Sequence, residues 1–321
     1  MPRLDKTADR QEKDRLSFMY KRKIYIIVGV VFACMCLSFF VYAKRDSDVP
    51  HTYEELLAWP VERLGELDIA RMNLLCATGL PGSEDLDVEA TLAVLDEWGE
   101  LAKSNERKYK QSFVPNIEKY ERSYALFLSV YLGFTLKEDL NCKYSRYLIA
   151  SGALADMKSI RFFKDSRDLF LNCFVERQEG TCASFPVLMV AIGRRCEYPL
   201  YVVSTKGHLF CRWDDGNEKM NLEVSCKGVD NKKDLYYKTW PFTPTEQDIK
   251  YEKFFVNMTP EMELCTFLDL RGSCLMANKR YEEAFEVYKK SLKYMPNSRV
   301  VKWSMDDARR RMNIQNMETK K

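Results

Sequence analysis

The sequence predicts an α+β fold in which a buried helix is followed by antiparallel strands. Residues 182–195 are apolar on all sides, which is typical of a buried helix. Residues 200–204 and 207–213 are rich in β-branched and aromatic side chains, which favours strands. The turn signal at 214–217 indicates a hairpin, and 219–225 is the returning strand.

Amphipathic helices precede this core. Apolar residues recur at three- and four-residue spacing across 53–102, and a second helix is expected to start after Asp85 or Asp87. The charged stretch 104–115 predicts a loop, and 118–131 again predicts a helix. Such helices indicate packing and carry no functional signal.

The entry into the buried helix is expected to be a turn. An apolar segment over 166–175 is followed by the polar residues 176–180, which predict that turn. Pro186 falls near the helix start, where its missing N–H is tolerated, and Pro199 follows its end.

The carboxy-terminal part has a different pattern. After a Pro- and Tyr-rich loop over 236–244, Thr259 and Pro260 predict a helix start. Small residues and a closing proline at the expected positions of a 34-residue period predict one tetratricopeptide-like helical hairpin with its cap over 259–313. Residues 298–313 would form the capping helix, because a lone repeat cannot bury its own face.

The amino-terminal part predicts a membrane anchor. Residues 24–43 are twenty uncharged, mostly apolar positions, enough to span a bilayer as a helix. The preceding tail, 1–23, holds eight Lys or Arg and four acids, so we expect it to stay in the cytoplasm and the rest to be extracytoplasmic. This places a single-pass protein in the inner (cytoplasmic) membrane. A cleaved signal peptide ending near 41–43 is the alternative.

Charge and cysteine usage exclude several classes. Beyond the span, 42 basic and 43 acidic residues nearly balance, so nucleic acid is not an expected partner. No CxxC pair is present and the chain has only two histidines, so we expect no metal site and no cofactor. Nine cysteines follow the span; the odd count leaves at least one free, and the disulfide pattern cannot be read.

One cysteine and one histidine form the candidate site. Because His51 lies in a polar linker, an imidazole partner for thiol chemistry would be His208. Cys182 follows a Gly-Thr turn and opens the buried helix, where the helix dipole and free N–H groups lower a thiol pKa. A third group should orient the imidazole, and alternation along the returning strand offers Asn221 and Glu223 equally.

The segments EGTCASFPVLMVAIGRRCEYPL, KGHLFCRW and MNLEVS resemble the transglutaminase-like superfamily, in a bacterial branch that carries tetratricopeptide repeats. The resemblance covers about residues 53–300. It implies a papain-like fold over 53–245, with Cys182 as nucleophile, His208 as base and Asn221 where relatives carry Asp. An asparagine can orient a neutral imidazole but adds no negative charge. Gln178 is the residue positioned to assist an oxyanion, although a plain turn role is favoured.

Two functions from different classes follow. The first is a membrane-anchored thiol hydrolase or acyl transferase acting on amide or ester bonds of a protein or peptide through Cys182, His208 and Asn221. The second is a catalytically inactive module that holds a protein partner outside the membrane. The substrate and the oligomeric state cannot be read from the sequence.

Overall fold

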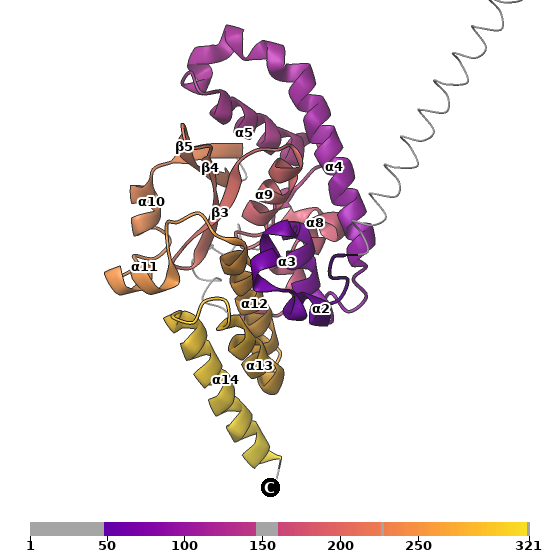
Figure 1. Cartoon of the computed structure of the whole chain (residues 1–321), viewed down its shortest axis with the longest axis vertical. Helices are drawn as coiled ribbons and strands as arrows, with labels where there is room; N and C mark the ends of the chain where they lie inside the picture. Colours follow the sequence, from indigo (N-terminus) through magenta and orange to yellow (C-terminus); the bar gives the residue numbers. More distant parts are fainter. Residues whose placement is uncertain (1–47, 146–159, 226–227, 320–321) are drawn as a thin grey trace, which may run out of the picture. The chain divides into compact units, whose positions relative to one another are not determined.

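Helices and two sheets make up an α+β architecture in the part of the chain that the computed structural model describes, residues 48–145, 160–225 and 228–319 (Figure 1). The predicted tail 1–23 and membrane span 24–43 lie outside these residues. Among the residues that the structure does describe, no helix is long and apolar enough to cross a membrane.

The amino-terminal helices confirm the predicted pattern, except that the helix predicted over 118–131 begins only at Tyr124. They are α2 (Tyr53–Ala58), α3 (Ile69–Ala77), α4 (Val88–Tyr109) and α5 (Tyr124–Phe134), with a 3-10 helix at Val61–Glu66. Side-chain caps explain two of the starts: Thr52 forms a capping box with Glu55, and Asp87 accepts from the Ala90 N–H.

The loop predicted over 104–115 is wrong. Helix α4 continues to Tyr109, and 3-10 helices follow at Lys110–Ser112 and Val114–Tyr120. The reason is aromatic packing: Tyr109 stacks on Tyr131 with ring centroids 5.0 Å apart, and Phe113 packs against Phe127 at 5.3 Å. A window of charged residues does not show such contacts to a distant helix.

The main sheet is antiparallel, in the order β3-β4-β5-β6. Its strands are β3 (Leu200–Thr205), β4 (His208–Asp214), β5 (Lys219–Ser225) and β6 (Gly228–Lys232). The first three confirm the prediction, and β6 was not expected. Asp214 pairs with Lys219 across the predicted hairpin turn.

The two faces of this sheet have different neighbours. Helix α9 (Phe185–Arg195) packs on one face, where the Cys211 thiol lies 3.2 Å from the carbonyl of Pro186. On the other face, Phe210 stacks on Tyr237 of α10 (Asp234–Thr239) at 3.7 Å. Residues 236–239, which were predicted to be part of a loop over 236–244, belong to helix α10.

The segment before α9 is short and turn-rich. It contains 3-10 helices at Ile160–Phe163 and Ser166–Asp168, then α8 (Asn172–Arg177). Strand β2 (Glu179–Gly180) then pairs in parallel with β1 (Lys143–Tyr144). The predicted helix over 182–195 begins only at Phe185, because 182–184 form a turn.

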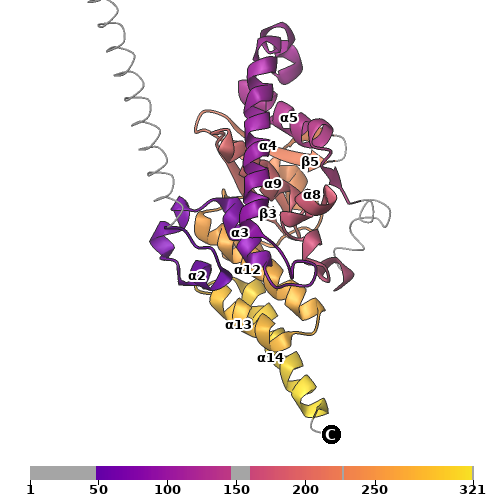
Figure 2. The same cartoon turned by 90° about the vertical axis from the view of Figure 1, so that its right-hand side faces the viewer.

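The carboxy-terminal helices confirm the predicted hairpin and cap as secondary structure. They are α11 (Glu246–Glu252), α12 (Pro260–Ala277), α13 (Tyr281–Ser291) and α14 (Arg299–Glu318). Thr259 and Ser298 cap α12 and α14 with their side chains. Helix α12 lies beside α3 in both views (Figures 1 and 2). Residues 51–321 therefore form one unit, with the hairpin packed onto the preceding helices.

Candidate active site

Cys182 lies in a turn that its neighbours hold rigidly. The Thr181 N–H donates to Ser184 Oγ at 3.0 Å, and Thr181 Oγ1 donates to the Asp168 carbonyl at 2.6 Å. The same Oγ1 accepts from the Ala183 N–H at 3.1 Å. Within the described residues the Cys182 N–H has no hydrogen-bond acceptor. That N–H is therefore free to bind an oxygen of a ligand.

Cys182 differs from the other cysteines that the structure describes. All of these are free thiols, but only Cys182 is partly exposed and the others are buried. Burial raises the pKa of Cys142 to about 12 and that of Cys196 to about 11. Such thiols stay protonated near neutral pH and do not react readily. Cys182 is the described cysteine that a reagent can reach.

His208 is buried at the start of β4, and its two ring nitrogens have different surroundings. Nε2 lies 3.1 Å from Glu223 Oε2. Nδ1 is buried and has no partner at hydrogen-bond distance among the described residues. Burial lowers the pKa of His208, but the neighbouring Cys182 thiol and the Glu223 carboxylate outweigh it and raise the pKa to about 9. An imidazolium is thus stable here at neutral pH.

Aromatic rings and a tyrosine hydroxyl enclose His208 and Glu223. Tyr237 donates its hydroxyl to Glu223 Oε2 at 2.9 Å, the same oxygen that faces His208. Trp240 places its ring edge-on to the imidazole at 4.7 Å between centroids. Nothing in the sequence pattern of 236–244 predicted these two contacts, because they depend on how α10 packs under the sheet.

The prediction of Asn221 as the third member differs from the structure. The Asn221 amide donates to the Lys232 carbonyl at 3.0 Å and to Asp234 Oδ1 at 2.6 Å, and its oxygen accepts from Arg212 Nε at 2.7 Å. Its hydrogen-bonding capacity is used in holding Arg212, directly opposite on β4. Glu223, the alternative that alternation had left open, is the residue that contacts His208.

Strand register explains the difference. Asp214 pairs with Lys219 and Cys211 with Leu222, so each step back along β4 is a step forward along β5. Asn221 therefore lies opposite Arg212, four residues or about 13 Å along the strand from His208. Glu223 lies two residues closer. The length of the hairpin turn was a signal in the sequence that could have decided between them.

Gln178 takes the plain turn role. It adopts a left-handed conformation with φ 56° at the end of α8, and its Oε1 accepts from the Asn141 side chain at 2.8 Å. The side chain is exposed, so nothing directs it toward Cys182.

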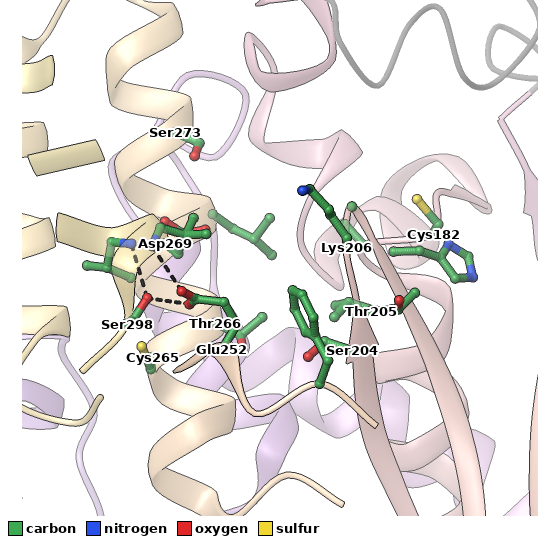
Figure 3. Close-up of a pocket in the computed structure, with 18 of the residues that line it drawn as sticks. Cys182, Ser204, Thr205, Lys206, Glu252, Cys265, Thr266, Asp269, Ser273 and Ser298 are labelled. Atoms are coloured by element: carbon green, nitrogen blue, oxygen red, sulfur yellow. Dashed lines mark hydrogen bonds between the residues drawn. The ribbon is translucent and has the colours of Figure 1, made fainter. Parts of the chain in front are cut away.

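Cys182 and His208 both line a cavity of about 600 Å³. In Figure 3, Cys182, Thr205 and Lys206 lie on one side of it, and Asp269, Thr266 and Ser298 lie on the other. The first side belongs to the turn before α9 and to the β3–β4 hairpin, and the second to α12 and α14. The cavity is therefore large enough for a side chain or short peptide to reach the thiol.

No protein-family model matches this sequence, and neither the curated proteins nor the solved structures compared with it gave a significant match. A partly exposed thiol, a buried imidazole and a carboxylate in series are the components of nucleophilic catalysis by cysteine.

Proposed function

We propose that this protein is a thiol-dependent hydrolase or acyl transferase acting on amide or ester bonds of a protein or peptide. The observation that carries the proposal is the series Cys182, His208 and Glu223, in which the thiol and the carboxylate act together on one buried imidazole. We further propose that the site belongs to a transglutaminase-like, papain-like domain, anchored through 24–43 in the inner membrane and facing away from the cytoplasm.

The proposed reaction has two halves, formation of an acyl-enzyme and its breakdown, and His208 takes and returns a proton in each. His208 takes the proton of the Cys182 thiol to form the imidazolium that its raised pKa favours, and the sulfur attacks the substrate carbonyl carbon. The Cys182 N–H stabilises the negative charge on the carbonyl oxygen. His208 then returns the proton to the leaving amine or alcohol as the C–N or C–O bond breaks, which leaves an acyl-enzyme. Water or an amine attacks the acyl carbon and gives its proton to His208. The C–S bond then breaks, and His208 returns that proton to the Cys182 sulfur.

Glu223 has the orienting role in this scheme. Its carboxylate binds Nε2 of His208, which leaves Nδ1 for the proton exchanged with Cys182. A carboxylate also stabilises the imidazolium formed during the reaction, which a neutral amide cannot do. Glu223 in place of Asn221 thus strengthens the chemical argument for activity.

The test is alkylation of the full chain by iodoacetamide at pH 7, with the modified cysteines identified by peptide mass mapping. We expect Cys182 to react at least about tenfold faster than any other cysteine, since thiolate content sets the rate. His208→Ala should remove this advantage, and Cys182→Ala should remove the labelled peptide. A Cys182 that reacts no faster than the buried cysteines would exclude catalysis and favour the alternative of a protein-binding scaffold.

A further inference from the structure

The wall of the cavity opposite Cys182 is one face of helix α12. Thr266, Asp269, Leu270 and Ser273 line it at spacings of three, four and seven residues, the period of a helix face. Figure 3 shows Asp269 across the cavity from Cys182. The helical hairpin therefore contributes one wall of the cavity, including an acidic side chain.

Asp269 is a carboxylate without a partner. Its Oδ1 is buried and accepts no hydrogen bond from any group that the structure describes. Burial, and to a smaller extent the charge of Glu252, raises the pKa of Asp269 to about 7. The Asp269 side chain is partly buried, and a buried carboxylate oxygen such as its Oδ1 is normally paired, because desolvation of the charge is costly.

Glu252 and Lys206, two other charged side chains of the cavity wall, are already paired. Glu252 accepts from Ser298 Oγ at 2.6 Å and from the N–H groups of Arg299 at 2.7 Å and Val300 at 3.1 Å. Lys206 donates to Asp248 Oδ2 at 2.9 Å. Because Lys206 and Glu252 already have these partners, neither side chain forms an ion pair or hydrogen bond with Asp269.

The surface between Cys182 and Asp269 is largely apolar. Aromatic and aliphatic side chains supply it: Phe162, Phe163, Phe242, Phe254, Leu270 and Met295. A ligand that fits this cavity has an apolar stem and a single positive charge at the end that meets Asp269. An aliphatic ammonium, as on a lysine side chain, has that chemistry.

We propose that Asp269 binds the aliphatic ammonium group of a substrate whose reacting end lies at Cys182. The link to a reacting end rests on the proposed function, whereas the ammonium site itself rests on the cavity and on the unpaired Asp269 carboxylate. The site selects substrates by charge: a basic residue is accepted, and a neutral or acidic residue of the same length is not.

The experiment measures binding without chemistry, in the full chain carrying Cys182→Ala. The probes are n-butylamine and 1-butanol, which share an aliphatic stem and differ in charge, titrated at pH 8 by saturation-transfer NMR. We expect the amine to bind at least about tenfold more tightly, because a charge-assisted bond to a desolvated carboxylate is stronger than a neutral one. Equal affinities for the two probes would overturn the proposal, and this comparison needs no substitution at Asp269.

A pair of variants locates the site. Asp269→Asn keeps the shape of the side chain and removes its charge, so it should abolish the preference for the amine. Glu286→Gln, at an acidic residue of α13 outside the cavity, should preserve it. An amine preference that survives Asp269→Asn would place the cation elsewhere and refute the assignment. A third probe, n-butylguanidine, shows whether the site prefers a compact ammonium or a planar guanidinium.

The two proposals fail separately. Alkylation of the native thiol tests Cys182, and amine binding to the Cys182→Ala chain tests Asp269. A reactive thiol with no preference for the amine would support the proposed enzyme and refute the ammonium site. An unreactive thiol with amine binding would leave a cation-binding module.

Discussion

At the scale of single residues, the Cys182 thiol and the charge on Glu223 together favour the protonated form of His208. The Glu223 carboxylate helps to raise the pKa of His208 to about 9, so Glu223→Gln should lower that pKa. At each pH between 6 and 8 we expect Cys182 to be alkylated about tenfold more slowly in Glu223→Gln than in the native protein, since one pKa unit changes the imidazolium-to-imidazole ratio tenfold. The difference should vanish above pH 9, where the imidazole is neutral in both proteins. The measurement is the iodoacetamide rate against pH.

The matched control for Glu223→Gln is Asn221→Ala, on the same strand and face. It removes the contacts to Arg212 and Asp234 and none to His208, so it should reduce stability and leave the pH profile of alkylation unchanged. A profile that shifts in Asn221→Ala and not in Glu223→Gln would restore the assignment made from the family resemblance.

A second residue-scale prediction concerns the stability cost of Asp269. Its folded-state pKa of about 7 lies above the ordinary 3.8, so the folded state binds more protons than the unfolded state between these values. The contribution of Asp269 to the stability of the protein should therefore fall as pH rises from about 4 to about 7. Asp269→Asn avoids this loss and should be more stable by about 1–3 kcal/mol at pH 8 and nearly equal at pH 4. Urea unfolding at the two pH values measures the difference.

The titratable groups that face Asp269 could also contribute to the pH dependence of stability. They are Glu252 of α11, which raises its pKa, and Cys265 of α12 and Tyr288 of α13, whose pKa values the Asp269 charge helps to raise. Neither the thiol nor the phenol titrates below pH 8, so between pH 4 and 8 the Asp269 carboxyl dominates. A stability gap that stays constant over this range would contradict the raised pKa.

At the scale of elements, local patterns predicted most helices and strands, and what they missed depends on distant contacts. Cys182 and His208 could be singled out because histidine is scarce and because the sequence predicted each at the start of a clear element. Strand β6 and helix α10 were missed, since their polar sequences become regular only when β5 and the Phe210 ring provide a surface. The contacts of Tyr237 and Trp240 with His208 were missed for the same reason, because they depend on helix α10.

The helical hairpin supplies the element-scale prediction. A Cβ atom added at Gly272 of α12 would lie 2.5 Å from the Tyr288 ring of α13, closer than atoms can approach. Gly272→Ala should thus cost about 1–3 kcal/mol of stability through overpacking. Gly65→Ala is the matched control, because its Cβ would lie 3.8 Å from Pro260 in ordinary contact. Thermal unfolding of both variants measures the contrast, and an equal effect would mean that the hairpin separates easily.

At the scale of the whole molecule, the hairpin and the preceding helices behave as parts of one folding unit in this structure. Arg271 of α12 reaches the end of α3, where its Nη1 donates to the Cys76 carbonyl at 2.9 Å and to the Thr78 carbonyl at 2.7 Å. Its guanidinium also lies 4.1 Å from the centre of the Tyr53 ring. Carbonyls at a helix end need such donors, because they have no partner within the helix.

The site itself depends on this docking, since Cys182 and Asp269 line one cavity from opposite sides. Arg271→Met leaves two α3-end carbonyls without their donor and should lower global stability by about 3 kcal/mol. Arg280→Met is the matched control: Arg280 reaches the Gly79 carbonyl at 3.1 Å from an exposed position, and its loss should cost less than about 0.5 kcal/mol. Calorimetry of the full chain should show one transition for residues 51–321, shifted as a whole by Arg271→Met. Two transitions, only one of them moved, would make the hairpin an independent domain and the cavity a variable gap between domains.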